Sequence, residues 1–408
     1  MNARHATWTL YLGLALASAL AANRAALAKD PPVDANSAAA ASAAASAGMD
    51  AELLAKIPAR MLQFSDEGQF SGAVTLVARQ GKIVHLAAVG EADVATHRPM
   101  TIDTLFAVAS MTKPITATAL MILVDEGKVG LDDPASKYVP EFKQSALKTG
   151  TPKREITVRD LLTHTSGLIG EQRNEGTLAE TAAKMAARPL AFEPGSKWQY
   201  GPSITICGRI VEVASGMPFE KFLEQRIFEP LGMYDTTFLP TPEQQPRVAR
   251  LYQPGKDGKG LARVEHWIND MTPGKTPNPS GGLFSKATDM ARFYQMVLGG
   301  GQSDGPRILS AKAVEEMTRV QTGDMQAGFT PGNAWGLGWC VQREPQGVSR
   351  MLSPGSFGHG GAFGTQGWVD PQKQMIFVLL IQRTGFGNSD GSAIREAFQQ
   401  LAVDAIKN

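Results

Sequence analysis

The chain has 408 residues, of which 43% are hydrophobic and 19% are charged. That length accommodates one large domain or two ordinary ones with a substantial core. Lysine and arginine total 40 against 39 aspartate and glutamate, so the formal net charge is only +1. A balance this close to neutral gives no electrostatic reason to expect a nucleic acid or an anionic membrane as a partner.

The first residues have the pattern of a secretory leader. Arg4 precedes an apolar run of 15 residues from Trp8 to Ala22, and small residues follow it. A membrane-spanning helix needs about 20 apolar residues, so removal of this segment is a better interpretation than anchoring. We therefore expect residues 1–28 to be a signal peptide and the protein to be exported, periplasmic or secreted, with no stable membrane span after cleavage.

Residues 29–50 are dominated by alanine and serine. Such low complexity predicts a flexible linker, and the folded domain is then expected over 51–408. The first elements of that domain are two β-rich runs from Ser71 to Asp93 around a Gln-Gly turn, which predict a hairpin.

Helical patterns follow. They cover Ile115 to Glu126 and, after a loop rich in glycine, aspartate and proline, most of Ile156 to Glu229. Polar connections then run to about residue 280. Beyond them the sequence predicts two helices (ATDMARFYQMVL and SAKAVEEMTRV), strand-like runs (WGLGWCVQ, GTQGWVD and MIFVLLIQ) and a closing helix (SAIREAFQQLAVDAI).

Strands near both ends of the mature chain, with helices between them, predict an α+β fold of the α/β sandwich type. The expected core is an antiparallel sheet formed from both ends of the mature chain and flanked by helices. A mostly helical region is inserted over about 111–270.

The numbers and spacing of cysteine and histidine argue against a fold that depends on several disulfides or on a bound metal. Cys207 and Cys340 are the only cysteines, and they are expected to be buried free thiols, although a single disulfide between them stays open. The six histidines show neither HExxH nor HxH spacing, so no metal is expected, and no organic cofactor is implied.

The stretch ASMTKP, residues 109–114, carries the first chemical signal. Ser110 and Lys113 are three residues apart at the expected start of a helix, so their side chains lie on one face. Pro114 fits a helix start, because amide donors there are unused. A serine fixed beside an amine at a helix N-terminus suits a nucleophile, although such a serine is more often only a helix cap.

Two decoys show how weak the spacing is alone. Ser145 and Lys148 repeat the S-x-x-K pattern, and Lys148 even begins a K-T-G triplet, but the surrounding residues are polar and predict a surface loop. The run from Gly301 to Gly305 matches the G-x-S-x-G nucleophile elbow without the buried strand that this motif requires.

Several further segments in the same order make the signal specific. After SMTKP come ITVRDLLTHTSGL, FEPGSKWQYGPS, IFEPLGM, PSGGLFSKATDMARF and FGHGGAFGTQGWVDP. Together they resemble the class C β-lactamase-like serine hydrolases, a family that includes penicillin-binding proteins, carboxylesterases and D-amino-acid peptidases. The resemblance spans about residues 60–405, and it implies the same sandwich with a helical region.

The resemblance implies roles for individual residues. Ser110 would be the nucleophile, Lys113 its proton partner and Tyr200 the tyrosine of the family's Y-x-N element. A tyrosine suits general-base work only if a nearby ammonium lowers its pKa, and Lys113 could supply that charge.

The segment from His359 to Ala362 would occupy the place of K-T-G on an edge strand. Gly360 and Gly361 would let the substrate approach closely there. The amides of Ser110 and Ala362 would then form an oxyanion hole. His164 is expected to stabilise a turn rather than to act in catalysis, and Trp335, Trp339 and Trp368 to pack in the core or the cleft wall.

Two departures from the family pattern bear on the substrate. Pro202 replaces the asparagine of Y-x-N, and His359, at most partly charged at neutral pH, replaces the lysine of K-T-G and is a weaker carboxylate anchor. The sequence therefore predicts a serine hydrolase that cleaves carboxylic esters or strained amides through an acyl-enzyme on Ser110, and it favours a member of the carboxylesterase type. The alternatives are a β-lactamase or D-amino-acid peptidase acting on β-lactam or peptide substrates and, from another class, a non-catalytic ligand-binding relative.

Overall fold

The computed structural model describes residues 38–407 except 172, 175 and 256–259. The predicted signal peptide, residues 1–28, lies outside the described residues, as do residues 29–37 of the predicted linker.

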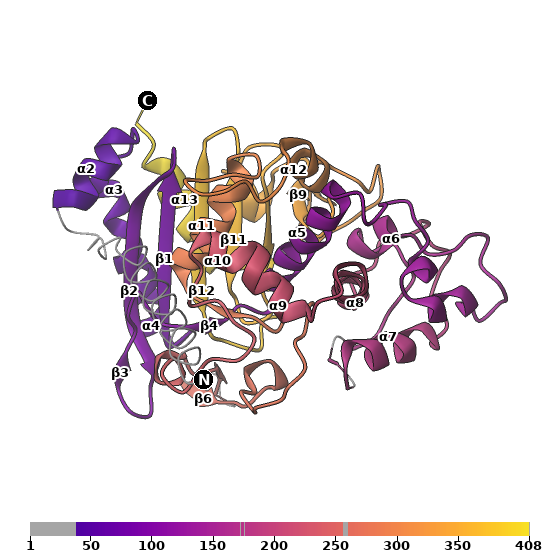
Figure 1. Cartoon of the computed structure of the whole chain (residues 1–408). Coiled ribbons are helices and arrows are strands. Elements are labelled where there is room, and N and C mark those ends of the chain that lie inside the picture. The colour runs from indigo at the N-terminus through magenta and orange to yellow at the C-terminus, as the bar shows by residue number, and fades with distance from the viewer. Residues whose placement is uncertain (1–37, 172, 175, 256–259, 408) are drawn as a thin grey trace, which may run out of the picture. The chain divides into compact units, whose positions relative to one another are not determined.

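An eight-stranded antiparallel sheet forms the centre of the described part of the chain, with strand order β3-β2-β1-β12-β11-β10-β9-β8 (Figure 1). β1 pairs with β2 on one side and with β12 on the other, so strands from the two ends of the chain meet in the middle. The strands are β1 Gly72–Arg79, β2 Lys82–Asp93, β3 Arg98–Pro99, β8 Asn333–Trp335, β9 Cys340–Gln342, β10 Phe357–Gly360, β11 Gln366–Asp370 and β12 Met375–Ile381. This confirms the predicted fold class and the predicted origin of the sheet.

The predicted hairpin is β1 and β2. Its two-residue turn is Gln80 and Gly81, whose φ angles are 52° and 78°. Two positive φ values match the twist of a tight hairpin, and glycine adopts them without steric cost. Two small additional sheets pair β4 Phe106–Ala107 with β7 Phe284–Ser285 and β5 Tyr252–Pro254 with β6 Leu261–Arg263.

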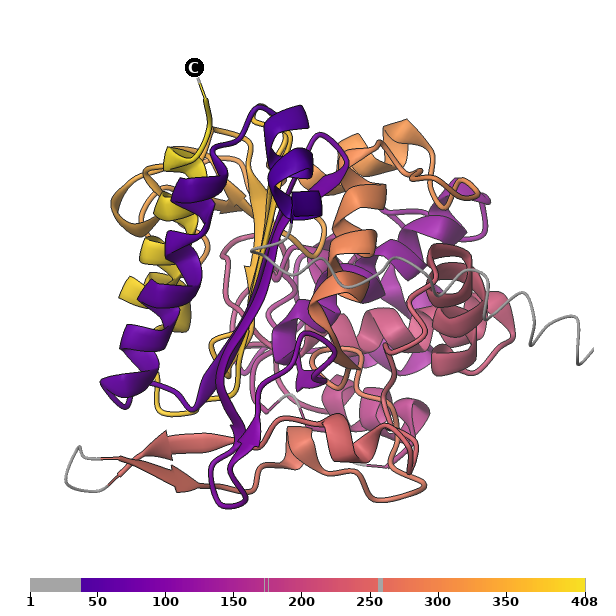
Figure 2. The same ribbon diagram turned by 90° about the vertical axis from the view of Figure 1, so that its left-hand side faces the viewer.

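Helices cover both faces of the large sheet. Figure 2 shows the sheet nearly edge-on, with α4 Lys56–Asp66 and α13 Ala393–Asp404 on one side and α11 Ala287–Leu298 with the helical region on the other. The remaining helices are α3 Ala51–Leu54, α5 Thr112–Asp125, α6 Val158–Leu162, α7 Leu178–Ala186, α8 Ser203–Ser215, α9 Phe219–Leu223, α10 Glu229–Leu231 and α12 Ala311–Thr318. A π-helical turn, η4 Glu224–Phe228, joins α9 to α10. Helices α5 to α10 thus fall within 112–231, and residues 232–286 are mostly loop.

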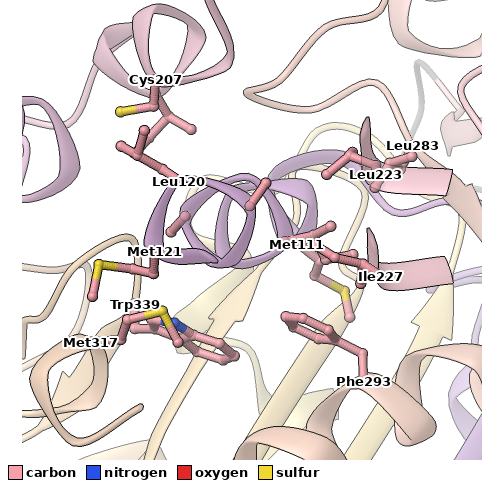
Figure 3. Packing of buried hydrophobic residues seen from close by; sticks show 14 of the residues in the cluster. Met111, Leu120, Met121, Cys207, Leu223, Ile227, Leu283, Phe293, Met317 and Trp339 are labelled. Carbon is pink, nitrogen blue, oxygen red and sulfur yellow. The ribbon is translucent and has the colours of Figure 1, made fainter. Parts of the chain in front are cut away.

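α5 is the central helix of the larger core. Every residue from Thr112 to Leu123 is buried, as expected of a helix that is apolar on all sides. Figure 3 shows Leu120 directed toward Cys207 of α8, whereas Met121 lies near Met317 and Trp339. Rigid packing on every side fixes the N-terminus of α5, where Ser110 and Lys113 lie.

The predicted flexible linker is wrong for residues 38–50. Ala38–Ser46 forms a helix, α2, and Ala44, Ala47 and Met49 are fully buried. Arg79 Nη1 donates to the carbonyl oxygens of residues 47 and 48, at 3.0 and 2.8 Å. Alanine is the best helix former and packs closely without a large side chain, so low complexity here does not mean absence of structure.

Other predictions can be compared with the described residues. Cys207 and Cys340 are both free and buried, as expected. No helix in the described ranges is long and apolar enough to cross a membrane. The same residues contain no group of three or more histidine, cysteine or acidic side chains placed to hold a metal ion.

Candidate active site

Ser110 lies in a strained turn between a short strand and the buried helix. β4 is followed by Val108 and then by a 3₁₀ turn, η1 Ala109–Met111, that leads directly into α5. Ala109 has a φ of 47°, in the left-handed region that a residue with a Cβ rarely adopts. Such strain persists only where the surroundings enforce it, and it is concentrated at functional sites. The prediction of a helix start at about Ser110 is confirmed.

Lys113 is completely buried beneath Ser110. Its Nζ lies 3.2 Å from Ser110 Oγ and 2.6 Å from the carbonyl oxygen of Ser280. Burial lowers the pKa of Lys113 well below 10.5, because the charged form loses its hydration. A carbonyl oxygen can only accept, so Lys113 Nζ donates to Ser280, and the same nitrogen lies within hydrogen-bond distance of Ser110 Oγ.

Tyr200 completes a group of three side chains. It lies just before α8, its hydroxyl is hydrogen-bonded to Ser110, and Lys113 Nζ is 4.7 Å from the centre of its ring. Part of the ring is exposed to the cleft, but burial of the hydroxyl raises the pKa of Tyr200 above its usual value of 10. The condition stated for general-base work, a Tyr200 pKa lowered by an ammonium on Lys113, is therefore not met, since burial favours the neutral form of both groups.

His359 lies near the end of β10, which is not the edge strand that the sequence suggested. β9 pairs with β10 only at Phe357 and Gly358. Beyond Gly358 the side of β10 that faces away from β11 has no pairing strand, so residues from His359 onward still border the cleft. β10 is therefore paired on both sides at its start and on one side only at its end.

The imidazole of His359 is buried and neutral. Its Nδ1 is 2.6 Å from the carbonyl oxygen of Gly360, so Nδ1 must carry the proton. Burial and the nearby Lys113 lower the pKa of His359 to about 3. The expectation that His359 is at most partly charged at neutral pH, and so a weak carboxylate anchor, agrees with this lowered pKa.

The glycines after His359 are required by space. A Cβ on Gly361 would lie 2.5 Å from the carbonyl oxygen of Val108 and 2.1 Å from Thr365 Oγ1. A Cβ on Gly360 would lie 1.8 Å from Asp390 Oδ1. Only glycine lets the end of β10 approach the Ser110 turn this closely. Ala362 follows, exposed, and no backbone hydrogen bond in the described part of the chain uses its amide.

Two aromatic rings, those of His164 and Trp335, lie close to the ring of Tyr200. The ring centre of His164 lies 4.6 Å from that of Tyr200, and Trp335 lies 6.0 Å away. His164 has a φ of 58° directly after α6, and its Nδ1 is 3.0 Å from Ser203 Oγ. It stabilises a turn, as predicted. Trp335, Trp339 and Trp368 are fully buried, which confirms the expected core packing.

The three side chains lie at a cleft of about 540 Å³. Every predicted site residue except Lys113 lines it, and Lys113 lies directly beneath Ser110. The lining residues are Ser110, Gly170, Glu171, Tyr200, His266, Trp267, Ile268, Ser280, Gly281, Phe329, His359, Gly360, Gly361, Ala362, Phe386, Gly387, Asn388, Ser389 and Asp390. The structure thus brings together segments that are up to 280 residues apart in the sequence.

The decoys lie elsewhere. Ser145 directly follows a short 3₁₀ helix, η3 Pro140–Gln144, Lys148 is exposed, and neither lines the cleft. The run from Gly301 to Gly305 forms a turn between α11 and α12 rather than a strand-to-helix elbow. Both were predicted not to be sites.

Sequence reasoning missed most of the cleft wall. Ser280 acts on Lys113 through its carbonyl, which every residue type has, so only its place in the PSGGL segment could have drawn attention to it. Trp267 begins a short 3₁₀ helix, η6 Trp267–Asn269, and Phe329 lies in a loop. Asp390, which accepts a hydrogen bond from Gln366 at 2.9 Å, had no motif around it.

Comparison with known proteins assigns the chain to a family. The family model described as Beta-lactamase matches residues 52–402. The chain belongs to the β-lactamase family of serine hydrolases. This confirms the resemblance drawn from the motifs, and the chain is accordingly an enzyme of the serine hydrolase class.

Relatives of this β-lactamase-family chain include an uncharacterized protein of Mycobacterium tuberculosis, which is 34% identical over 359 residues covering 79% of this chain and 88% of that one. Esterase EstB of Burkholderia gladioli is 31% identical over 383 residues, covering 85% and 95% of the two chains. Among solved structures, the hydrolase EstCE1 shares the fold, with a TM-score of 0.75 at 24% identity over 88% of this chain and 99% of that chain.

Proposed function

We propose that this serine hydrolase is a carboxylesterase that cleaves neutral esters through an acyl-enzyme on Ser110. The observation that carries the proposal is the charge of the cleft. None of the described residues lining it is lysine or arginine, and two of them, Glu171 and Asp390, are acidic. β-Lactams and peptides with a free C-terminus carry a carboxylate, which needs a positive partner in a site of this kind.

The first step uses the neutral amine beneath the nucleophile. Ser110 Oγ attacks the ester carbonyl carbon while the serine proton passes to the lone pair of Lys113. The carbonyl oxygen becomes the oxyanion, which the amides of Ser110 and Ala362 would stabilise. The hydrogen bond to the carbonyl oxygen of Ser280 holds the amine of Lys113 in place, and the same oxygen accepts a hydrogen bond from the ammonium that forms.

Tyr200 then serves as the proton shuttle. When the tetrahedral intermediate collapses, the bond between the carbonyl carbon and the alcohol oxygen breaks. Tyr200 donates its proton to that oxygen and takes one from Lys113, which returns to the neutral amine. Water attacks the acyl-enzyme by the same route in reverse and releases the acid, so one ester and one water give one acid and one alcohol. A phenol whose pKa is raised by burial suits proton donation better than it suits the role of a general base.

Pro202 supports the choice of simple esters. It lies directly before α8 and offers no side-chain amide where the family pattern has one. An acyl group bearing its own amide, as in penicillins and peptides, therefore lacks that partner here. The similarity to Esterase EstB supports the same assignment.

The test compares three reagents on one enzyme. Purified protein is incubated with p-nitrophenyl butyrate, a fluorescent penicillin and a D-alanyl-D-alanine peptide, and the Ser110→Ala and Ser145→Ala variants are the matched pair. We expect rapid ester turnover that Ser110→Ala alone abolishes, and little reaction with the other two reagents. A lasting penicillin label without ester turnover would instead support a penicillin-binding protein. Reaction with none of the three would support a non-catalytic relative.

We further propose that the protein acts outside the cytoplasm, on the basis of the leader-like first 28 residues. Expression of the full chain with a C-terminal tag, followed by cell fractionation and N-terminal sequencing, tests this. Recovery of an uncleaved chain in the cytosol would contradict it.

A further inference from the structure

Two groups of apolar side chains line the cleft, and each is called a wall here. One wall consists of Phe329 and the half-buried Tyr200. The other consists of Trp267, Ile268 and Phe386. Apart from Tyr200, none of these residues belongs to a motif identified in the sequence.

The Phe329 wall is attached to the proton-transfer side of the site. The ring of Phe329 packs edge-on against Tyr200 with centres 4.9 Å apart, and against Trp198 at 5.9 Å. Asn388 Nδ2 donates to the Phe329 carbonyl at 2.7 Å, which fixes the loop. Phe329 is nevertheless 36% exposed, so a large apolar face is held open toward the cleft.

The Trp267 wall contacts the segment that includes Ala362. His266, next to Trp267, packs against Phe363 with ring centres 5.2 Å apart, and Phe363 directly follows Ala362. Phe386 lies near the same segment, because a Cβ on Gly364 would come within 2.7 Å of its ring. This wall therefore borders the segment that would bind the oxyanion.

The Trp267 loop is rigidly held. Lys275 Nζ donates to the carbonyl oxygens of Trp267 and Asp270, at 2.6 and 2.9 Å. Asn269 donates to Gln382, which in turn donates to the carbonyl of Ala107 in the strand before Ser110. The wall and the nucleophile are thus connected through a short chain of hydrogen bonds, as a binding surface requires.

The reaction geometry gives each wall a substrate part. In the tetrahedral intermediate the alcohol oxygen must point toward the proton donor Tyr200, and the oxyanion toward Ala362. The alcohol group then extends along the Phe329 wall, and the acyl chain leaves in the remaining direction, toward the second wall. We propose that the cleft is divided into an alcohol subsite at Phe329 and an acyl subsite formed by Trp267, Ile268 and Phe386. This inference rests on the proposed esterase function.

Two ester series separate the subsites. The first keeps the acetyl group and varies the alcohol (ethyl, butyl and benzyl acetate), with released acid followed by pH-stat. The second keeps p-nitrophenol and lengthens the acyl chain from acetyl to decanoyl. Phe329→Ala should reduce the preference for benzyl over ethyl about tenfold, the loss of one aromatic contact, and leave the acyl-chain preference unchanged. Trp267→Ala should reduce the preference for long acyl chains and leave the preference for benzyl over ethyl unchanged.

Controls distinguish folding from specificity. Leu62→Ala removes an apolar side chain of similar exposure on α4, outside the cleft, and should alter neither series. Phe329→Leu retains apolar volume but not the aromatic face, and should reduce the benzyl preference less than Phe329→Ala does. If both cleft variants shift both series equally, or each shifts the wrong one, the two-subsite inference is overturned. If the wild-type protein hydrolyses neither series, the esterase function itself fails.

Discussion

The chain contains the S-x-x-K pattern twice, and the two copies differ in everything except spacing. Ser110 and Lys113 lie at the start of a helix buried on all sides, and their polar atoms are 3.2 Å apart. Ser145 and Lys148 lie after a short 3₁₀ helix, and that lysine is exposed. Burial disfavours the charged form of an amine, and of the two lysines only Lys113 is buried. The chemistry therefore depends on burial of the amine, which the four-letter pattern does not encode.

The largest effect is expected at the nucleophile. Ser110→Ala removes the hydroxyl that we propose forms the acyl bond, so kcat/KM for p-nitrophenyl butyrate should fall by about 10⁴-fold or more. Intact-mass spectrometry after brief incubation with a slow ester should show an acyl adduct on the wild type alone. An adduct that persists in Ser110→Ala would place the nucleophile elsewhere.

Lys113 tests whether burial of the amine is the decisive difference. Lys113→Arg keeps a positive charge that cannot be given up at accessible pH, whereas Lys113→Met removes the nitrogen. Both should lower kcat by about 10²- to 10⁴-fold, because each lacks a neutral base. Substantial activity in Lys113→Arg would mean that charge, rather than proton acceptance, is what the site uses.

The same lysine predicts a pH dependence of stability. Its folded-state pKa is lowered below the unfolded value of about 10.5, so the unfolded chain binds more protons between those two values. Stability from this group is thus complete above the unfolded pKa and decreases as the pH falls toward the folded one. Urea midpoints at pH 9 and pH 7 should differ more in the wild type than in Lys113→Met. Equal differences would show that the buried amine is charged in the folded state.

Much of this could be predicted from sequence, for physical reasons. The buried helix after Ser110 and the strands of the sheet have strong periodic patterns, so the fold and the positions of Ser110, Lys113 and Tyr200 followed from local chemistry and motif order. The protonation states of the side chains in the site could not be predicted in this way. Whether Tyr200 and His359 are charged depends on burial by segments hundreds of residues away, so the sequence could state only a condition for Tyr200 and an upper limit for the charge of His359.

The cleft walls and α2 were missed for different reasons. Trp267 lies in a three-residue 3₁₀ helix and Phe329 in a loop held by the long-range Asn388 bond, and no periodicity marks either segment. Residues 38–50 were misinterpreted because an alanine-rich segment resembles a linker in composition, although it packs well once Arg79 supplies hydrogen bonds.

The copy formed by Ser145 and Lys148 also differs from the Ser110 copy in a second feature, because no strand end lies in close contact with it in the described residues. Gly361 tests whether that contact matters at Ser110. Gly361→Ala would place a methyl group 2.5 Å from the Val108 carbonyl and displace β10 from the Ser110 turn. We expect kcat to fall by about tenfold or more, with a loss of about 1–3 kcal/mol in the free energy of unfolding. Gly150→Ala, at the end of the decoy's own K-T-G, is the control, since an added Cβ there meets nothing within 4 Å and only its φ of 133° adds strain. If activity survives in Gly361→Ala, the contact between the strand end and the turn does not position the site.

The smallest effect is expected at the decoy copy itself. Ser145→Ala and Lys148→Ala change groups that line no part of the cleft, and surface substitutions of this kind usually alter stability by less than about 0.5 kcal/mol. Ester turnover and acyl-adduct formation should therefore remain within about twofold of the wild type. The double variant is the sharper measurement, because it removes the whole pattern at once while Ser110 and Lys113 remain. A marked loss in that variant would mean that the exposed copy takes part in the reaction, and burial would no longer explain why one copy acts and the other does not.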